Sequence, residues 1–307
     1  MKGLISNIER YAINDGFGLR TTVFMKGCPL TCRWCCNPET QKPFPEMVFF
    51  QDKCIGCGMC AQDCPQGAIG ADVKADRSKC ETCYQRKDAF ACTQRCYAQC
   101  RKQSGEEMDI QQVIAVVERD MALYRRSGGG VTLSGGEPLL QGEFAVALAE
   151  QLTKRRMDVA IETCGAAREE DCQRIAPYLS FAFFDIKHMD TKKHCHWIGV
   201  GNEYILHNAI LLDSLAGKYG FGLVYRVPVV PKYNDTPEEI AAICRFLKAK
   251  AKHYKGMELL PYHKLGRGKY ESLGRSYPMG KATPPSEEKM EALYKVLAEQ
   301  GISRYQF

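Results

Sequence analysis

The sequence predicts an α/β fold built around a parallel sheet. Its 307 residues are 45% hydrophobic and 25% charged, which is typical of an ordinary globular protein. From residue 105 onward, short apolar runs alternate with stretches of helical spacing, and such alternation indicates parallel strands joined by right-handed crossovers. Polar or cysteine-containing motifs follow the apolar runs, as expected where parallel strands gather chemistry at their carboxyl ends.

Six apolar runs are the expected strands. Each is short and bounded by polar or glycine-containing segments. About six strands are too few for a closed eight-stranded barrel, and they suit either an open barrel or a doubly wound sheet. In chain order the runs are LRTTVFM at 19–25, VTLSGG at 131–136, DVAIET at 158–163, FAFFDIK at 181–187, GLVYRVPVV at 222–230 and GMELLPYH at 256–263.

Helices are expected between these runs. The segment MDIQQVIAVVERDMALY at 108–124 places apolar residues on one face at helical spacing. Another helix begins at TPEEI, where Thr236 can cap, Pro237 takes the first helical position and Glu239 completes a capping box. A last helix ends the chain. The apolar faces of the three helices consist of Ile110, Val113, Ile114, Val117, Met121 and Tyr124; Ile240, Ile243, Cys244 and Leu247; and Met290, Leu293, Tyr294 and Leu297.

Charge and hydropathy exclude several classes of protein. The first residues lack the apolar core and cleavage site of a signal peptide, and no run reaches the roughly 18 apolar residues of a membrane helix. We therefore expect a cytoplasmic protein without a membrane partner. The net charge of +6 comes from scattered residues, which indicates a solvated surface or a face for an acidic partner, and nothing indicates nucleic-acid binding.

Cysteine is the most unusual feature of the composition. The chain has 17 cysteines, and thirteen of them lie between residues 28 and 100. In a reducing cytosol such clustering indicates metal rather than disulfides. Residues 51–104 also lack long apolar periodicity and need metal clusters as a scaffold. We therefore expect three regions: 1–50 with the first strand and cysteine loop, 51–104 as an inserted iron–sulfur domain, and 105–307 with the rest of the fold.

The stretch KGCPLTCRWCCNPET at 26–40 holds the first cysteine motif. Thiolates from Cys28, Cys32 and Cys35 can each bind one iron of a 4Fe-4S cluster, which leaves the fourth iron open to a small molecule. Zinc is the main alternative, but a structural zinc site is normally closed by paired ligands. The CxxxCxxC spacing favours Cys35 as the ligand and leaves the adjacent Cys36 as a packed thiol or as one that lies beside the ligands.

Several stretches accompany this motif in an order that is similar to one family. With the CxxxCxxC spacing they make the chain resemble the glycyl-radical-enzyme activating enzymes, the pyruvate formate-lyase activase-like members of the radical SAM superfamily. The resemblance spans nearly the whole chain and implies a partial (β/α)6 radical SAM barrel, with a ferredoxin-like iron–sulfur domain inserted after residue 50. The stretches are DGFGLRTTVFMKGCPLTCRWCCNPET, SGGGVTLSGGEPLLQ, FFDIKHMD, YRVPVVPKYND and LPYHKLGRGKY.

The resemblance also implies an activity. Members reductively cleave S-adenosylmethionine (SAM) to methionine and a 5′-deoxyadenosyl radical, which removes a hydrogen atom from a glycine in the C-terminal loop of a partner glycyl radical enzyme. Such an oxidoreductase needs anaerobic conditions and a flavodoxin or ferredoxin-type electron donor. Two alternatives stay open: a radical SAM enzyme with another peptide or small substrate, and an iron–sulfur electron carrier, although a carrier needs no open three-cysteine site.

The same resemblance implies a SAM-binding site. In this family SAM chelates the open iron, and Gly135, Gly136 and Glu137 bind its amino group chiefly by backbone. Asp185 and Lys187 alternate on a strand and so face the same side, where a lysine can pair with the SAM carboxylate. The remaining positions that match SAM-binding residues are Trp34, Arg226 and His263.

Two weaker matches concern a cation and the partner protein. Glu162 and Thr163 match a place where relatives hold a monovalent cation near SAM, although a Glu stands where an Asp is usual. Asp15 and Gly16 belong to a loop that holds the partner's glycine strand in relatives. Those relatives generally read Asp-Gly-Pro-Gly, and Phe17 of this chain replaces the proline.

The segment CIGCGMCAQDCPQGAI has the spacing of a bacterial ferredoxin run, in which the fourth cysteine binds the other cluster. A second, altered run follows it, so the sequence predicts two auxiliary 4Fe-4S clusters that serve as an electron relay or a metal-stabilised docking surface. Cys96 and Cys100 also have the final spacing, which leaves Cys100 as the spare or alternative. The proposed ligands are Cys54, Cys57, Cys60 and Cys96 for one cluster, and Cys64, Cys80, Cys83 and Cys92 for the other.

Four cysteines lie outside these runs. Cys172 and Cys244 have core positions on apolar helix faces. Cys164 stands at a strand end and Cys195 in an expected polar loop, and the sequence assigns neither a role.

Overall fold

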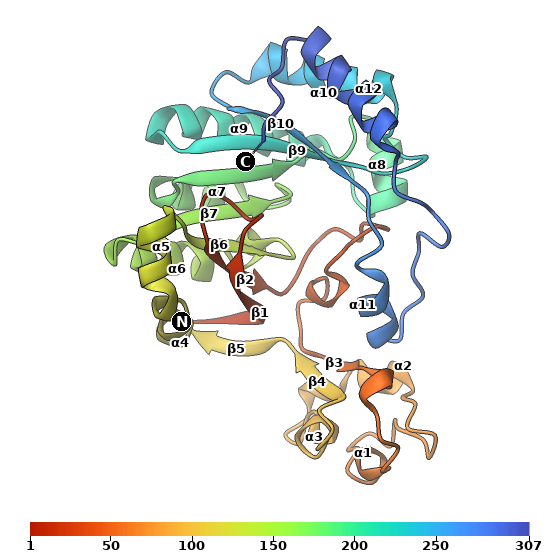
Figure 1. The fold of residues 1–307 in the computed structure, drawn as a ribbon. Coiled ribbons are helices and arrows are strands. Elements are labelled where there is room, and N and C mark those ends of the chain that lie inside the picture. The colour runs from red at the N-terminus through yellow and green to blue at the C-terminus, as the bar shows by residue number, and fades with distance from the viewer. Residues whose placement is uncertain (307) are drawn as a thin grey trace.

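This computed structural model describes residues 1–306, in which ten strands are present (Figure 1). They span Lys2–Ala12 (β1), Arg20–Met25 (β2), Glu46–Phe49 (β3), Arg101–Ser104 (β4), Glu106–Asp109 (β5), Gly130–Gly135 (β6), Asp158–Thr163 (β7), Phe181–Asp185 (β8), Gly222–Val229 (β9) and Gly256–Pro261 (β10). Eight of them form one sheet in the order β10-β9-β8-β7-β6-β2-β1-β5. Strands β2 and β6 to β10 are parallel, and β1 and β5 pair antiparallel at one edge. The six predicted strands and the α/β class are confirmed.

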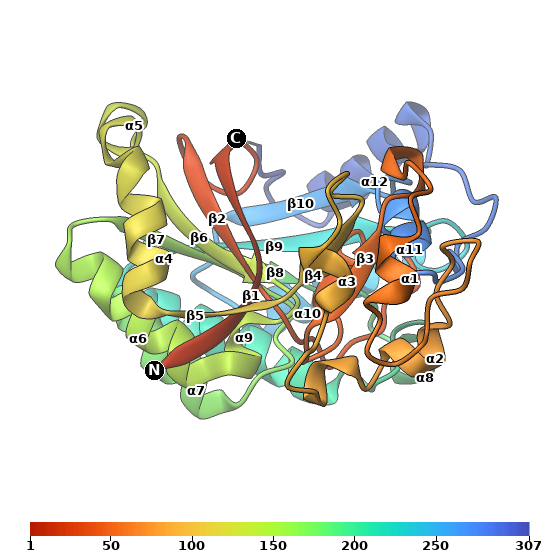
Figure 2. The same cartoon turned by 90° about the horizontal axis from the view of Figure 1, so that it is seen from below.

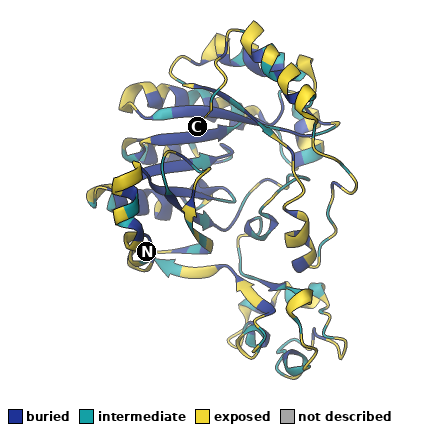
Figure 3. Ribbon diagram, in the orientation of Figure 1, coloured by how far each residue is buried: buried dark blue, intermediate teal, exposed yellow. Residues whose placement is uncertain are grey.

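Most of the helices lie around this sheet, whereas the first three lie in the segment between β3 and β4 (Figure 2). They span Met59–Gln62 (α1), Arg77–Cys80 (α2), Ala91–Gln94 (α3), Ile110–Val117 (α4), Met121–Ser127 (α5), Gly142–Lys154 (α6), Glu169–Ile175 (α7), Thr191–Ile198 (α8), Glu203–Tyr219 (α9), Pro237–Lys250 (α10), Arg267–Ser272 (α11) and Glu287–Glu299 (α12). Strands are mostly buried and the outer faces of helices are exposed (Figure 3). None of the helices in the described residues has the length and apolar character that a membrane crossing requires.

Two local expectations were wrong. The helix expected over 108–124 is two helices, α4 and α5, because the buried Asp120 between them turns inward to Arg10 Nε and Thr21 Oγ1, both at 2.8 Å. At the start of α10, Thr236 accepts a hydrogen bond from Glu239 N as predicted. The Glu239 carboxylate accepts instead from Met189 N at 2.6 Å, so the capping box is not completed.

Residues 46–104, which we call the β3–β4 unit, lie below α11 in Figure 1. Strands β3 and β4 form a separate two-stranded antiparallel sheet, and α1, α2 and α3 lie between them in the chain. Arg77 donates to Met47 O at 2.6 Å within the unit and to Ser272 O of α11 at 2.8 Å. Glu46 of β3 pairs with Lys26 and Arg275. These contacts attach the unit beside the carboxyl end of β2.

A buried polar group fixes the loops after β8 and β9. Asn234, which is fully buried, donates to Lys187 O at 2.9 Å and Pro228 O at 2.7 Å. Next to it, His188 Nδ1 accepts from Asp190 N at 2.9 Å, and Glu239 Oε1 lies 3.1 Å from the same nitrogen. Burial, followed by the nearby Lys193, lowers the pKa of His188 to about 4.

This histidine should make the protein acid-sensitive. Because the unfolded state takes up a proton near pH 6.5 and the folded His188 resists it until about pH 4, stability is present above pH 6.5 and is lost as the pH falls. We expect a loss of about 2 kcal/mol between pH 7 and pH 5 from this group alone. Urea unfolding followed by tryptophan fluorescence measures it, and the loss should be smaller in His188→Gln; an equal loss in that variant would contradict the assignment.

Candidate functional site

The loop after β2 carries the first cysteine motif to the carboxyl edge of the sheet. Backbone hydrogen bonds hold it at both ends: Cys28 N donates to Gln41 O at 2.9 Å, and Thr31 N donates to Ile198 O of α8 at 2.7 Å. Cys35 N donates to Cys32 O at 3.1 Å, which turns the loop back on itself. These hydrogen bonds involve only backbone groups. They hold the loop in place without the cysteine side chains, which remain available to bind a metal cluster.

Lys187 provides a buried positive charge beside these thiols. Its ammonium group pairs with Asp185 Oδ2 at 2.6 Å, and only 8% of the side chain is exposed. Burial lowers the pKa of Lys187, but attraction by Asp185, Cys32 and Cys164 outweighs it, so the pKa lies well above its ordinary value. The structure therefore brings Asp185 and Lys187 together with the cysteine loop, and this cation suits an anionic cluster or a carboxylate ligand.

The Gly-Gly-Glu motif follows β6 and packs against the cysteine loop. A Cβ on Gly135 would lie 2.2 Å from Met25 O, and one on Gly136 would lie 2.2 Å from Gly27 O, so only glycine fits. Gly136 N donates to Met25 O and Glu137 N to Gly27 O, both at 2.9 Å. These N–H groups already donate to acceptors within the protein. The carbonyl groups of the turn are therefore the backbone atoms suited to accept a hydrogen bond from the amino group of a ligand.

The Glu137 side chain has a different role from its backbone. It is fully buried, and its carboxylate accepts hydrogen bonds from Thr163 Oγ1 at 2.8 Å, Cys164 N at 2.9 Å and Leu139 N at 3.1 Å. Burial raises the pKa of Glu137, whereas these hydrogen bonds lower it. The carboxylate joins the turn after β6 to the end of β7.

An aromatic cage lies next to the cysteine loop, and of its members sequence reasoning found only Trp34. Tyr233 is 4% exposed, and its ring centroid lies 4.9 Å from Trp34 and His188 and 5.1 Å from Trp197. Among the described residues its hydroxyl has no hydrogen-bond partner, although it is buried. Burial and the neighbouring Cys32 raise the pKa of Tyr233. A buried hydroxyl without a partner fits a bound polar ligand.

Three predicted groups lie outside the ion pair of Asp185 and Lys187, although Asp185 pairs in register with Arg226 on the neighbouring strand. The Arg226 guanidinium binds Glu162 at 2.6 Å and Glu258 at 2.7 Å, and it donates to Asn14 O at 3.2 Å. Glu162 also accepts from Ser134 Oγ at 2.7 Å, whereas its neighbour Thr163 donates to Glu137 on the opposite side of the strand. His263 follows β10 and is exposed.

The loop of Asp15 and Gly16 lies against the face of the sheet that carries the Arg226 side chain, which we call the inner face. Asp15 accepts from Thr22 Oγ1 at 2.5 Å through its side chain and from Thr132 Oγ1 at 2.7 Å through its carbonyl oxygen. The Phe17 ring meets Phe181 edge to face, with centroids 5.1 Å apart. The residue that departs from the family pattern therefore packs against β8 near this loop.

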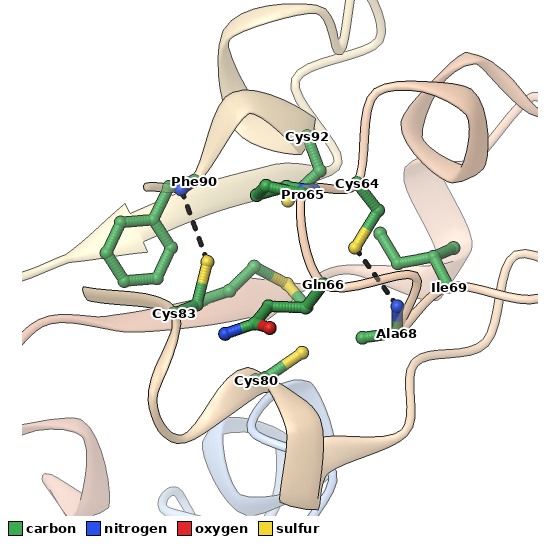
Figure 4. A pocket seen from close by; sticks show the side chains of 10 residues that line it. Cys64, Pro65, Gln66, Ala68, Ile69, Cys80, Cys83, Phe90 and Cys92 are labelled. Carbon is green, nitrogen blue, oxygen red and sulfur yellow. Dashed lines mark hydrogen bonds between the residues drawn. The ribbon is translucent and has the colours of Figure 1, made fainter. Parts of the chain in front are cut away.

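In the β3–β4 unit, four thiols surround one small cavity (Figure 4). Ala68 N donates to Cys64 Sγ at 3.2 Å and Phe90 N to Cys83 Sγ at 3.5 Å, and backbone donors of this kind suit metal-bound thiolates. No group of three or more ligating side chains among residues 1–306 is arranged for a single metal ion. The four cysteines are Cys64, Cys80, Cys83 and Cys92, the set that the ferredoxin spacing predicts.

The other predicted set is only partly brought together. Cys96 Sγ lies 3.3 Å from Cys100 Sγ, and Cys54 is within hydrogen-bonding reach of Cys100. Cys57 and Cys60 lie on the loop and first turn of α1 that follow Cys54. Cys100 therefore shares the site of Cys96, and both remain candidates for the fourth ligand.

The other cysteines lie outside these groups. Cys172 and Cys244 are buried on α7 and α10 as predicted. Cys36 is exposed rather than packed, and Cys195 is exposed and lies on α8 rather than in the expected loop.

Known proteins match the chain along its whole length. The profile of the radical SAM superfamily matches residues 77–247, and that of the 4Fe-4S binding domain matches residues 47–70. The isethionate sulfite-lyase activating enzyme of Desulfovibrio desulfuricans is 45% identical over 92% of this chain and 90% of that protein. The choline trimethylamine-lyase activating enzyme of Oleidesulfovibrio alaskensis is 37% identical over 100% of this chain and 96% of that protein. Streptococcus suis SuiB, bound to precursor peptide SuiA, shares the fold with a TM-score of 0.54 over 94% of this chain and 48% of that chain, at 10% identity.

The cavity of four thiols predicts a loss of iron on mutation. Replacing Cys83 by Ala should remove about four irons per chain after anaerobic reconstitution, because a 4Fe-4S cluster with three ligands is weakly held in a site built for four. The matched control is Cys244→Ala, a fully buried thiol on α10, which should keep all its iron. Equal iron in both variants would contradict a cluster at this cavity.

Proposed function

This chain belongs to the glycyl-radical-enzyme activating enzymes of the radical SAM superfamily, and we propose that it activates an isethionate sulfite-lyase. The relative with this partner is 45% identical, whereas the matches that activate choline trimethylamine-lyase and 4-hydroxyphenylacetate decarboxylase are 37% and 36% identical. The observation that supports the activity is that the CxxxCxxC loop, Lys187 and the Gly-Gly-Glu turn lie together at one edge of the sheet.

Cys28, Cys32 and Cys35 hold the SAM-binding cluster, and with SAM bound it supplies the radical that removes a hydrogen atom from the partner's glycine. Carbonyl groups of the turn at Gly135 and Gly136 accept hydrogen bonds from the amino group of SAM. Lys187, held by Asp185, neutralises the carboxylate. These residues fit a cluster with SAM because they combine three thiols, one buried cation and backbone groups that a ligand can approach closely.

Three side chains surround the rest of the ligand. Trp34 and Tyr233 provide the aromatic wall and the unpartnered hydroxyl, and His263 reaches the adenosine from the end of β10. Arg226 and the carboxylate of Glu162 act at a distance from the carboxylate of SAM, where they pair with each other. The predicted monovalent cation at Glu162 and Thr163 has weaker support, because Glu162 already pairs with Arg226.

The inner face of the sheet receives the partner's C-terminal glycine loop. Asp15 and Gly16 border this face, and Asn14 O accepts from Arg226, so the loop is tied to β9. Residues 1–50 and 105–307 form the barrel in this proposal.

Residues 51–104 form the ferredoxin-like insertion with two auxiliary clusters, which makes three clusters per chain. A flavodoxin or ferredoxin-type donor supplies the electrons. We place the protein in the cytoplasm because free thiolates and 4Fe-4S clusters need a reducing compartment.

The test is anaerobic activation of a partner. Reconstituted protein with SAM and dithionite should form 5′-deoxyadenosine and a glycyl radical on isethionate sulfite-lyase, detected by electron paramagnetic resonance (EPR). Cys32→Ala should lower both by at least about a hundredfold, because one of the three thiolate ligands is lost.

The control is Cys195→Ala, which removes an exposed thiol on α8 and should leave both signals unchanged. A glycyl radical on choline trimethylamine-lyase but none on isethionate sulfite-lyase would sink the partner proposal. Iron without 5′-deoxyadenosine would favour an electron carrier.

A further inference from the structure

Arg101, the first residue of β4, is a buried cation in the β3–β4 unit. Only 1% of this residue is exposed. Arg101 lies opposite Phe49 in the antiparallel pair of β3 and β4, so its side chain shares one face of this small sheet with Phe49 and Met47. Met47 belongs to the core of the unit, in which half of the buried residues are cysteines. The Arg101 guanidinium therefore lies on the side of the sheet that faces the cysteines.

No carboxylate among residues 1–306 pairs with this guanidinium. Its Nη2 donates to Val73 O, its Nη1 lies 3.4 Å from Met47 Sδ, and its Cζ lies 4.2 Å from the centre of the Phe49 ring. Nε is buried and has no hydrogen-bond partner in this part of the chain. A carbonyl oxygen, a thioether sulfur and an aromatic ring are all neutral groups. The positive charge of Arg101 is therefore not balanced by any protein group that it contacts.

The other four buried lysines and arginines of the described residues each have a carboxylate partner. The pairs are Arg20 with Asp158, Lys26 with Glu46, Lys187 with Asp185, and Arg226 with both Glu162 and Glu258. Burying a charge without a counter-ion is costly, which is why buried charges in proteins are normally paired. Arg101 is thus the exception, and it lies in the unit whose core is rich in thiols.

Met47 connects Arg101 to the cavity of four thiols. It lines this cavity together with Cys64, Cys80, Cys83 and Cys92. Its sulfur atom is the one that Arg101 Nη1 approaches, so a single side chain lies between the guanidinium and the cavity. Arg77 Nη1 lies 3.9 Å from the same sulfur, but Arg77 is only half-buried, so solvent screens part of its charge. A 4Fe-4S cluster with four thiolate ligands is an anion, and in this cavity it would supply the missing counter-ion.

We propose that Arg101 is the buried counter-cation of a 4Fe-4S cluster in the cavity of four thiols, and that its charge raises the reduction potential of this cluster. The inference rests on the proposed function, because it needs the auxiliary clusters. One electron from the donor reduces the cluster and increases its negative charge, and no bond forms or breaks. A fixed positive charge in surroundings of low dielectric constant therefore stabilises the reduced state more than the oxidised state.

The experiment is an EPR-monitored redox titration of the full, anaerobically reconstituted chain. The signal that wild type shows and Cys83→Ala lacks reports the cluster in the cavity of four thiols. In Arg101→Met, which removes the charge, the ratio of reduced to oxidised cluster at a fixed ambient potential should fall about tenfold, which is 59 mV for a one-electron couple. In Arg101→Lys the charge stays, and the ratio should remain within about threefold of wild type.

The matched control is Lys102→Met, which makes the same change of charge one residue further along β4. Lys102 is exposed, so water and salt screen its charge, and this variant should titrate like wild type. An unchanged potential in Arg101→Met with full iron content overturns the inference, and so does an equal shift in Lys102→Met.

A second neutral variant covers the case in which Arg101→Met loses its cluster. Arg101→Gln keeps an N–H donor for Val73 O but has no charge, and it should show the same fall in the ratio. Loss of the cluster from Arg101→Lys as well would contradict the inference, because that variant keeps the charge. A wild-type protein with no signal that Cys83→Ala removes would also overturn it, whereas 5′-deoxyadenosine and the glycyl radical on the partner test the proposed function separately.

Discussion

The buried carboxylate of Glu137 is the constraint on which the arrangement of the site depends. A carboxylate without solvent is costly unless several donors satisfy it, and here the donors come from the turn after β6 and from the end of β7. The backbone of the same residue binds Gly27 O in the cysteine loop. One residue therefore links the ends of β2, β6 and β7. Because Gly135 and Gly136 lack side chains, the three strand ends approach closely enough for these bonds to form.

The inner face of the sheet is polar, and its charged groups are paired with one another. Arg226 binds two glutamates and lies 3.3 Å above the centre of the Phe183 ring. Such a network is rigid only when each of its polar groups has a hydrogen-bond partner. Here Ser134 bonds Glu162 and Asn14 O accepts from Arg226. The loop of Asp15 and Gly16 is tied to the same network. A glycine-containing strand that enters this face would meet a preorganised polar surface, which suits backbone recognition more than contact with apolar side chains.

The β3–β4 unit cannot be stabilised by apolar side chains alone. Its small core consists of Met47, Cys60, Ile69, Cys83, Phe90 and Cys92, so that half of the buried residues are cysteines. A core of this size requires other stabilising interactions, and thiolate–iron bonds would provide them. Arg77 and Glu46 attach the unit to α11 and to β2. Because these contacts are polar and few, the unit depends on its own ligands for its internal order and on the barrel for its position.

The sequence alone determined the parallel strands and the thiols that gather in the β3–β4 unit. Strands β6 to β10 are apolar runs because most of their residues are buried, and the ferredoxin spacing predicted the group of Cys64, Cys80, Cys83 and Cys92. Strand β1 went unpredicted because it lies near the edge of the sheet and its sequence, KGLISNIERYA, mixes buried and exposed positions without strict alternation. Only the tertiary structure decided what Arg226, Tyr233, Cys164 and the side chain of Glu137 contact. Their partners lie on other strand ends, and no local pattern encodes which of them meet when parallel strands bring their carboxyl ends to one edge.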